Sequence, residues 1–152
     1  MNTLQLRCIL KTSPKTCHVQ VIATDQLPTR LIKYPCGYIV NTQDSIQPGK
    51  HWVAFWFDNL GHGEFFDSFG ERPGYYIQEF TNFLNRNTSN YERNTKVLQS
   101  DYSKTCGLYA VFYVLLRSKG FSLQQIQQCF TNDRRLNDHF MYRFAFHYLC
   151  CH

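Results

Sequence analysis

One cysteine in this sequence has the surroundings of a reactive thiol. Cys106 opens the apolar segment CGLYAVFYVLLRSKG, which predicts a buried helix from about Cys106 to Lys119. The partial positive charge at the beginning of a helix stabilises a thiolate, and a nearby histidine lowers the pKa of the thiol further. Gly107 follows at once and would leave room for a substrate carbonyl beside the sulfur. A cysteine in a helix is more often a small core residue, so this assignment depends on its partners.

Two further residues complete an acid–base arrangement if the segments that carry them pair as a hairpin. HWVAFWF and EFFDSFG flank the turn-forming sequence DNLGHG, which is typical of two antiparallel strands. If paired residue numbers add to an even number near 120, His51 and Asp67 lie on one face as near-diagonal neighbours, about 7–8 Å apart at Cβ. A shift of one residue would put them on opposite faces. The sequence permits this pairing without proving it.

A fourth candidate is Gln99, which lies seven residues before the cysteine in LQSDYSKTCG. If the chain folds back between them, its side-chain amide could lie beside Cys106 and donate a hydrogen bond to an oxyanion. The alternative is an ordinary polar loop residue, since the residues around it are Ser100, Asp101, Ser103 and Lys104.

The chain has the length of one domain, which we expect to span residues 1–152. Apolar runs at 19–23 and 38–40 predict strands before the hairpin. The polar stretch 85–96 predicts an exposed loop. Strands followed by helices make an α+β arrangement.

Helical patterns occupy the second half of the chain. Apolar residues recur at helical spacing at Tyr76, Phe80, Phe83 and Leu84. Ser122 and Gln125 form a capping box that predicts a short helix directly after the cysteine helix. A last helix is predicted from about Asp138 to Leu149.

Composition excludes several classes of protein. The chain is 43% hydrophobic and 18% charged, so it is neither disordered nor fibrous. The longest apolar run, Leu108 to Leu116, is too short to span a membrane, and the first residues lack the pattern of a signal peptide. The seven cysteines form no CxxC pair and are odd in number, which favours reduced thiols inside the cell.

The net charge and the C-terminal residues raise the question of two ligands, DNA and a metal ion. The net charge of +5 attracts polyanions. Two alternatives therefore stay open: the protein contacts DNA, or its positive charge serves no binding partner. The C-terminal HYLCCH contains His147, Cys150, Cys151 and His152. Adjacent cysteines rarely supply two corners of a tetrahedral zinc site, so we expect no metal and assign this tail no role.

The ordered motifs resemble one family of proteases. PCGYIVNTQDSIQPGKHWVAFWF, FFDSFG and LQSDYSKTCGLYAVFYVLL, from about Pro35 to Leu116, are similar to the adenovirus maturation protease family, adenain, and to its relatives in Polinton-type DNA elements. The ubiquitin-like-protein proteases resemble them more distantly. The resemblance implies a papain-like α+β fold with a mixed central sheet packed on the helix that carries the nucleophile.

The resemblance also implies roles for particular residues. Cys106 corresponds to the nucleophile, His51 to the general base, Asp67 to the acid that orients it and Gln99 to the oxyanion-hole glutamine. Adenain has Glu where this chain has Asp67. Trp52 corresponds to the aromatic residue beside the catalytic histidine, and Asn41 lies in the IVNT strand near the cleft.

The function implied is a cysteine endopeptidase of a DNA virus or mobile element, which matures capsid or other precursor proteins at small, glycine-containing sites. Two alternatives stay open: an isopeptidase that removes ubiquitin or a ubiquitin-like protein from host proteins, and a non-enzymatic, basic, DNA-associated protein on a protease scaffold. We expect a monomer that requires no cofactor and contacts no membrane, located in the host nucleus or cytoplasm and in the virion.

One departure from adenain bears on activation. Adenain is activated by DNA and by a viral peptide joined through a disulfide to a cysteine upstream of its glutamine. No cysteine lies between Cys36 and Cys106 here, which closes the covalent route, and the charge of +5 permits activation by DNA without requiring it.

Overall fold

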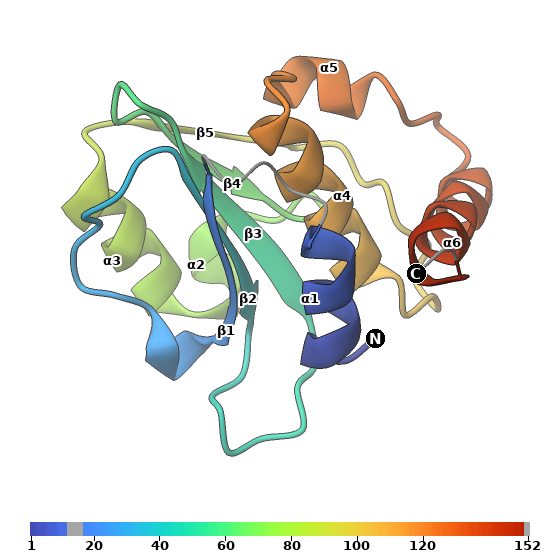
Figure 1. The fold of residues 1–152 in the computed structure, drawn as a ribbon, viewed down its shortest axis with the longest axis horizontal. Helices are drawn as coiled ribbons and strands as arrows, with labels where there is room; N and C mark the ends of the chain where they lie inside the picture. Colours follow the sequence, from blue (N-terminus) through green and yellow to red (C-terminus); the bar gives the residue numbers. More distant parts are fainter. Residues whose placement is uncertain (12–16, 151–152) are drawn as a thin grey trace.

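A mixed sheet of five strands forms the centre of the fold, in the order β1-β2-β3-β4-β5 (Figure 1). The computed structural model describes residues 1–11 and 17–150. β1 pairs with β2 and β4 with β5 in parallel, while the β2–β3 and β3–β4 pairs are antiparallel. The strands are β1 (His18–Ala23), β2 (Cys36–Asn41), β3 (Trp52–Phe57), β4 (Gly63–Phe66) and β5 (Tyr91–Arg93).

The β3–β4 hairpin has the register that brings His51 and Asp67 together. Ala54 pairs with Phe66 and Trp56 with Glu64, and the numbers add to 120 in both pairs. The expected placement within the strands is wrong by one residue at each position, because His51 directly precedes β3 and Asp67 directly follows β4. Both side chains therefore stand at the same end of the hairpin, just beyond its paired residues.

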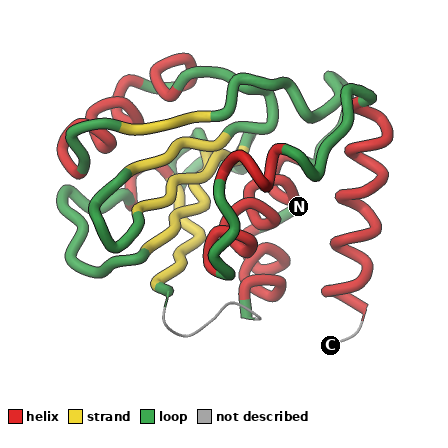
Figure 2. The backbone as a smooth tube through the Cα atoms, turned by 90° about the horizontal axis from the view of Figure 1, so that it is seen from above, coloured by secondary structure: helices red, strands yellow, loops and turns green. Residues whose placement is uncertain are grey.

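Helices cover both faces of the sheet (Figures 1 and 2). α4 lies on one face with α1 and α6 beside it, and α2 and α3 lie on the other face. The helices are α1 (Thr3–Leu10), α2 (Pro73–Tyr76), α3 (Gln78–Asn87), α4 (Cys106–Ser118), α5 (Leu123–Gln127) and α6 (Arg134–Cys150), and η1 (Thr24–Gln26) is a single 3-10 turn. The expected α+β fold with the cysteine helix packed on a mixed sheet is confirmed.

Alternating residues of β3 enter two separate apolar clusters. Ala54 and Trp56 pack with α4, whereas Val53, Phe55 and Phe57 pack toward α3. A strand that is buried on both faces has a nearly continuous apolar sequence, which explains WVAFWF. The burial of α4 from Cys106 to Leu115 likewise explains why that helix is apolar on nearly every side.

The predicted exposed loop at 85–96 is wrong in three respects. α3 continues to Asn87, Tyr91–Arg93 form the edge strand β5, and Asn94 is buried with 1% of its surface exposed. β5 is short and its sequence, YER, is polar, so neither length nor hydrophobicity distinguishes it from a loop.

Helix boundaries differ from expectation elsewhere as well. α1 was not expected, and α6 begins at Arg134 rather than near Asp138. The helical spacing from Tyr76 to Leu84 is divided at Ile77, whose extended backbone separates α2 from α3. The capping box of Ser122 and Gln125 is confirmed at the start of α5. Among the described residues, no helix is both long enough and apolar enough to cross a membrane.

Candidate active site

The thiol of Cys106 stands at the first residue of α4, where its surroundings stabilise a thiolate. Cys106 is buried, with 9% of its surface exposed. Burial opposes ionisation, but hydrogen bonding from His51, the charge of His51 and the backbone N–H groups of Trp52 and Gly107 outweigh it, so the pKa of the thiol is lowered. The N–H of Gly107 is the contribution expected of a helix start, and that of Trp52 comes from the beginning of β3.

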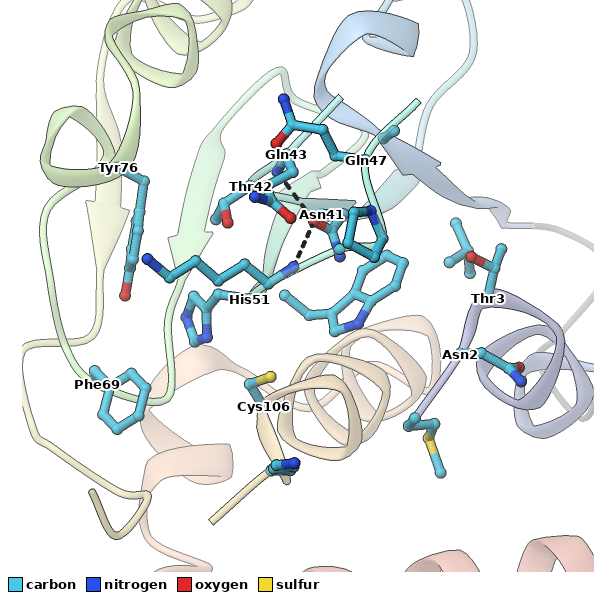
Figure 3. Close-up of a pocket in the computed structure, with 18 of the residues that line it drawn as sticks. Asn2, Thr3, Asn41, Thr42, Gln43, Gln47, His51, Phe69, Tyr76 and Cys106 are labelled. Carbon is cyan, nitrogen blue, oxygen red and sulfur yellow. Dashed lines mark hydrogen bonds between the residues drawn. The ribbon is translucent and has the colours of Figure 1, made fainter. Parts of the chain in front are cut away.

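His51 connects Cys106 to Asp67. Its Nε2 lies 2.7 Å from Oδ1 of Asp67, and both side chains are buried. Because Nε2 is engaged by the carboxylate, Nδ1 is the ring nitrogen available to the thiol. In Figure 3 the imidazole lies beside the Cys106 side chain within one cleft. The structure thus brings these three predicted residues together.

The imidazole of His51 is held in its protonated form. Burial alone would lower its pKa, but hydrogen bonds and charges from Asp67 and Cys106 raise it to about 9. The pKa of the thiol moves in the opposite direction. The two shifts together favour an imidazolium beside a thiolate over a neutral pair.

Asp67 is fixed by three residues that sequence reasoning did not connect with the site. Its Oδ2 accepts hydrogen bonds from Tyr76 Oη at 2.8 Å and from the backbone N–H of Glu71 at 3.1 Å. The Asn94 amide binds the backbone of Asp67 on both sides, accepting from its N–H at 2.9 Å and donating to its carbonyl at 2.5 Å. These bonds leave Oδ1 directed at His51.

Two aromatic rings lie against the imidazole. The centroid of Tyr76 is 4.9 Å from that of His51 at an interplanar angle of 28°, and the centroid of Phe69 is 5.3 Å away at 30°. Aromatic faces attract a cation, so both rings favour the imidazolium. They also restrict rotation of the ring away from Cys106.

Gln99 is buried, with 1% of its surface exposed, and lines the same cleft as His51 and Cys106. Gln99 lies outside any helix or strand, as the alternative of an ordinary polar loop residue has it, but its burial in the cleft is unusual for such a residue. Its Oε1 accepts from Ser68 Oγ at 2.6 Å, and its Nε2 donates to the carbonyl of Ser103 at 2.8 Å. Both ends of the amide are thus anchored, and the orientation of the side chain is set.

Asn41 closes the loop that leads to His51. Its Oδ1 accepts from the backbone N–H groups of Gln43 at 3.0 Å and Lys50 at 3.3 Å (Figure 3). The two ends of the 42–50 loop are therefore held to the end of β2. Asn41 supports the wall of the cleft through this loop.

Trp52 and Gly107 meet beside the candidate nucleophile. A Cβ on Gly107 would lie 3.2 Å from Cδ1 of Trp52 and 3.1 Å from Cδ2 of Leu6. These contacts are tighter than normal van der Waals packing. The structure therefore gives Gly107 a packing reason, the close approach of α1 and β3 to α4, and the expected space for a substrate carbonyl stays a prediction.

A cleft of about 1440 Å³ is lined by His51, Gln99 and Cys106 and extends to the beginning of α1. The 42–50 loop forms one wall, and residues between Val97 and Lys104 contribute to another. Asn2 and Thr3 border its far end (Figure 3). The volume is large enough for an extended peptide, since drug-sized ligands occupy about 300–1,000 Å³.

The protease interpretation agrees with a comparison against known families. Residues 30–134 match the family model described as adenovirus endoprotease, a match that includes all four candidate catalytic residues. The chain belongs to the adenovirus endoprotease family. In this chain the carboxylate bound to His51 is that of Asp67, the residue that the sequence suggested for this position.

Curated relatives come from large DNA viruses. A cysteine protease of African swine fever virus is 29% identical over 130 residues, a match that covers 78% of this chain and 46% of that protein. A protein of Acanthamoeba polyphaga mimivirus described as a thiol protease is 32% identical over 131 residues, covering 74% of this chain and 43% of that protein. In another isolate of African swine fever virus, the relative is named a SUMO-1 cysteine protease, and it is 28% identical over 130 residues (78% and 46% coverage). The chain spans less than half the length of these relatives.

A solved structure shares the fold. The crystal structure of the African swine fever virus protease aligns with a TM-score of 0.53 at 23% identity, over 76% of this chain and 43% of that one. The mixed sheet and its helices are therefore the family scaffold.

The described residues contain no group of three or more His, Cys, Asp or Glu side chains that could hold a metal ion. Cys151 and His152 of the HYLCCH tail lie outside the described residues. Of the residues that the sequence did not single out, Tyr76 fits an apolar helix pattern and Asn94 lies in a polar stretch. No signal local to either residue connects it with Asp67.

Proposed function

We propose that the chain is a cysteine endopeptidase in which Cys106 is the nucleophile, His51 the general acid and base, and Asp67 the residue that orients His51. The observation that carries this proposal is the continuous arrangement of the three side chains, with the imidazole bound to Asp67 at 2.7 Å and engaged with the thiol on its other side. Membership of the adenovirus endoprotease family supports the same assignment.

The reaction has two halves. The thiolate of Cys106 attacks the peptide carbonyl carbon, and the imidazolium of His51 gives its proton to the leaving amine as the C–N bond breaks. The resulting thioester is then attacked by water, from which neutral His51 takes a proton. Cleavage of the C–S bond releases the acid and restores the thiolate–imidazolium pair.

The proposal assigns two donors to the oxyanion in both halves. A side-chain amide carries two N–H groups, so the bond from Gln99 to Ser103 leaves one N–H for a substrate oxygen. The backbone N–H of Cys106 is among the first N–H groups of α4, which have no partner within the helix. Donors fixed before the charge develops contribute most to such a step.

As substrates we propose viral precursor proteins, cut beside glycine. Cys106 has only 9% of its surface exposed, and Trp52 lies against the adjoining Gly107, so a slender backbone reaches the thiol more easily than one with large side chains. The resemblance to adenain points to the same preference.

Fluorogenic peptides test the proposal. The purified chain should release the fluorophore from a peptide with two glycines before the scissile bond, and release far less when both are leucine. Cys106→Ala is the matched control, and it should fold and be inactive with both. The proposal would be contradicted if neither peptide released its fluorophore although Cys106 still reacted with an alkylating reagent.

A second candidate function is removal of a ubiquitin-like protein, because one viral relative is named a SUMO-1 cysteine protease. The tails of such modifiers end in glycine, so the chemistry at Cys106 would be the same. Ubiquitin and SUMO-1 carrying a C-terminal fluorophore, compared with the diglycine peptide, separate the two. Much faster release from an intact modifier would favour the second candidate, and equal rates would favour the endopeptidase.

A further inference from the structure

The segment between Leu98 and Cys106 belongs to no helix or strand, and it joins two of the proposed catalytic residues. Gln99 lies near its beginning, and Cys106 follows its end. The relative position of the oxyanion donor and the nucleophile therefore depends on what holds this segment.

A buried carboxyl group of α6 binds the segment at both ends. Oδ2 of Asp138 accepts from the backbone N–H of Ser100 at 3.2 Å and from the hydroxyl of Ser100. Oδ1 accepts from Oγ1 of Thr105 at 2.9 Å and from Oη of Tyr109 at 2.9 Å. Ser100 adjoins Gln99 and Thr105 adjoins Cys106, so one side chain connects the neighbours of both.

A short chain of bonds links this carboxyl group to the Gln99 amide itself. Oγ1 of Thr105 lies 2.8 Å from Oγ of Ser103, and the carbonyl of Ser103 accepts from Nε2 of Gln99 at 2.8 Å. A displacement of Thr105 would therefore move the Gln99 amide through these bonds. A displacement of Ser100 would move it through the backbone, because Ser100 is the next residue.

The residue before Asp138 adds a second anchor. Nδ2 of Asn137 donates to the carbonyl of Leu98 at 3.1 Å, directly before Gln99. Asn137 and Asp138 are 2% and 5% exposed, so these bonds are shielded from water. The contact between Arg134 and Asp101 is exposed by comparison, and such surface pairs contribute little.

Hydroxyl and amide donors, rather than a cation, satisfy the carboxyl group. None of the ion pairs between described residues includes Asp138. A buried carboxyl group needs its full set of donors, so it fixes the groups that supply them. α6 packs beside α4 and α1, which holds Asp138 on a rigid element (Figure 2).

We propose that Asp138 is a positioning residue for catalysis, which sets the place of the Gln99 amide relative to Cys106 through Ser100 and Thr105. This inference rests on the proposed cysteine endopeptidase function. Oxyanion donors act only within a narrow range of positions, and a shift of about 1 Å can reduce the rate about 100-fold.

The test is Asp138→Asn, which keeps the shape of the side chain. An amide offers one acceptor oxygen and an NH2 group that cannot accept from the N–H of Ser100, so one end of the segment is released. We expect kcat for the diglycine peptide to fall about 10–100-fold with KM nearly unchanged, because the loss occurs only as charge develops. Alkylation of Cys106 should keep its wild-type rate and pH dependence, since Asp138 bonds to none of the groups that lower the pKa of the thiol, which are His51 and the backbone N–H groups of Trp52 and Gly107.

A double-mutant cycle separates positioning from a general loss of structure. If Asp138 acts through Gln99, the Gln99→Ala/Asp138→Asn protein should be no slower than Gln99→Ala alone. Glu79→Gln, which alters an exposed carboxylate on α3, is the matched control and should leave turnover unchanged. If Asp138→Asn does not fold by circular dichroism, Ser100→Ala replaces it, with a smaller loss of kcat of the same kind.

The outcomes are distinct. Wild-type turnover in folded Asp138→Asn, multiplied losses in the double mutant, or a parallel loss of Cys106 alkylation would overturn the positioning role in an otherwise active enzyme. A wild-type chain without turnover would overturn the proposed function, and this inference with it.

Discussion

At the scale of residues, the ionisation of Cys106 depends on His51, and the protonation of His51 depends on Asp67. The hydrogen bond of 2.7 Å between His51 and Asp67 and the rings of Tyr76 and Phe69 all favour the imidazolium. The imidazolium in turn lowers the pKa of the thiol. Removing one member should therefore alter the titration of the others as well as the rate.

Asp67→Asn tests the role of Asp67 in supporting His51 and, through it, Cys106. The amide keeps the shape of the side chain but cannot stabilise an imidazolium as a carboxylate does, so we expect the protein to fold and kcat to fall about 10–100-fold. The loss should be smaller than in serine proteases, because the surroundings of Cys106 already favour its thiolate before substrate binds. Steady-state kinetics with the diglycine peptide would measure it, and unchanged turnover would mean that His51 is oriented by something else.

The pH dependence of kcat/KM follows from the directions of the two shifts. The active form needs a deprotonated Cys106 and a protonated His51. Activity should rise with pH as the thiol loses its proton, since the pKa of that thiol is lowered, and fall as His51 loses its proton near its pKa of about 9. A bell-shaped profile that includes neutral pH is the expected result. A single rise centred on the ordinary thiol pKa of about 8.5 would contradict the pairing.

At the scale of elements, the site depends on β5 and the residue that follows it. β5 pairs in parallel with β4, which brings Asn94 beside the backbone of Asp67. Asn94→Ala would leave a buried N–H and a buried carbonyl without this partner, so the free energy of unfolding should fall by about 2 kcal/mol. Urea denaturation would measure this loss, and turnover should fall as well because Asp67 loses its support. Asn90→Ala, an exposed change in the same stretch, is the control and should alter neither.

The elements that could be predicted from the sequence are those with strong, regular patterns. α4 is apolar on nearly every side and ends near Gly120, and the β3–β4 hairpin joins two aromatic strands through a turn rich in Asp, Asn and Gly. The register of that hairpin is less well determined, because both of its faces are buried and apolar, so the pattern permits the meeting of His51 and Asp67 without requiring it.

The parts that could not be predicted are held by long-range polar contacts. Asn94 and Asp138 are surrounded in sequence by polar residues, and their burial comes from hydrogen bonds to distant segments. Tyr76 matches an apolar helix pattern, although its hydroxyl binds Asp67. Gln99 was singled out by resemblance to a family, because no local pattern distinguishes it from its polar neighbours.

At the scale of the whole molecule, the positions of the cysteines bear on how activity would be controlled. No cysteine lies between Cys36 and Cys106, and Cys36 is buried in the cluster on the α3 face of the sheet. Burial raises the pKa of the Cys36 thiol to about 12, which makes it a poor partner for thiol exchange. We therefore expect activity without a disulfide-linked peptide. The prediction would be wrong if the pure protein gained activity only with a cysteine-containing peptide and lost that gain on reduction.

The central claim is that Cys106 is ionised and reactive because His51 lies beside it. The most direct test is to treat the native protein with limiting iodoacetamide at pH 7 and to locate the modification by mass spectrometry. Cys8 and Cys129 are exposed and Cys106 is buried, so accessibility alone would favour the first two. The structure predicts that Cys106 is alkylated first, and that His51→Ala removes this preference. Labelling of Cys8 or Cys129 before Cys106, or an unchanged preference in His51→Ala, would contradict the account.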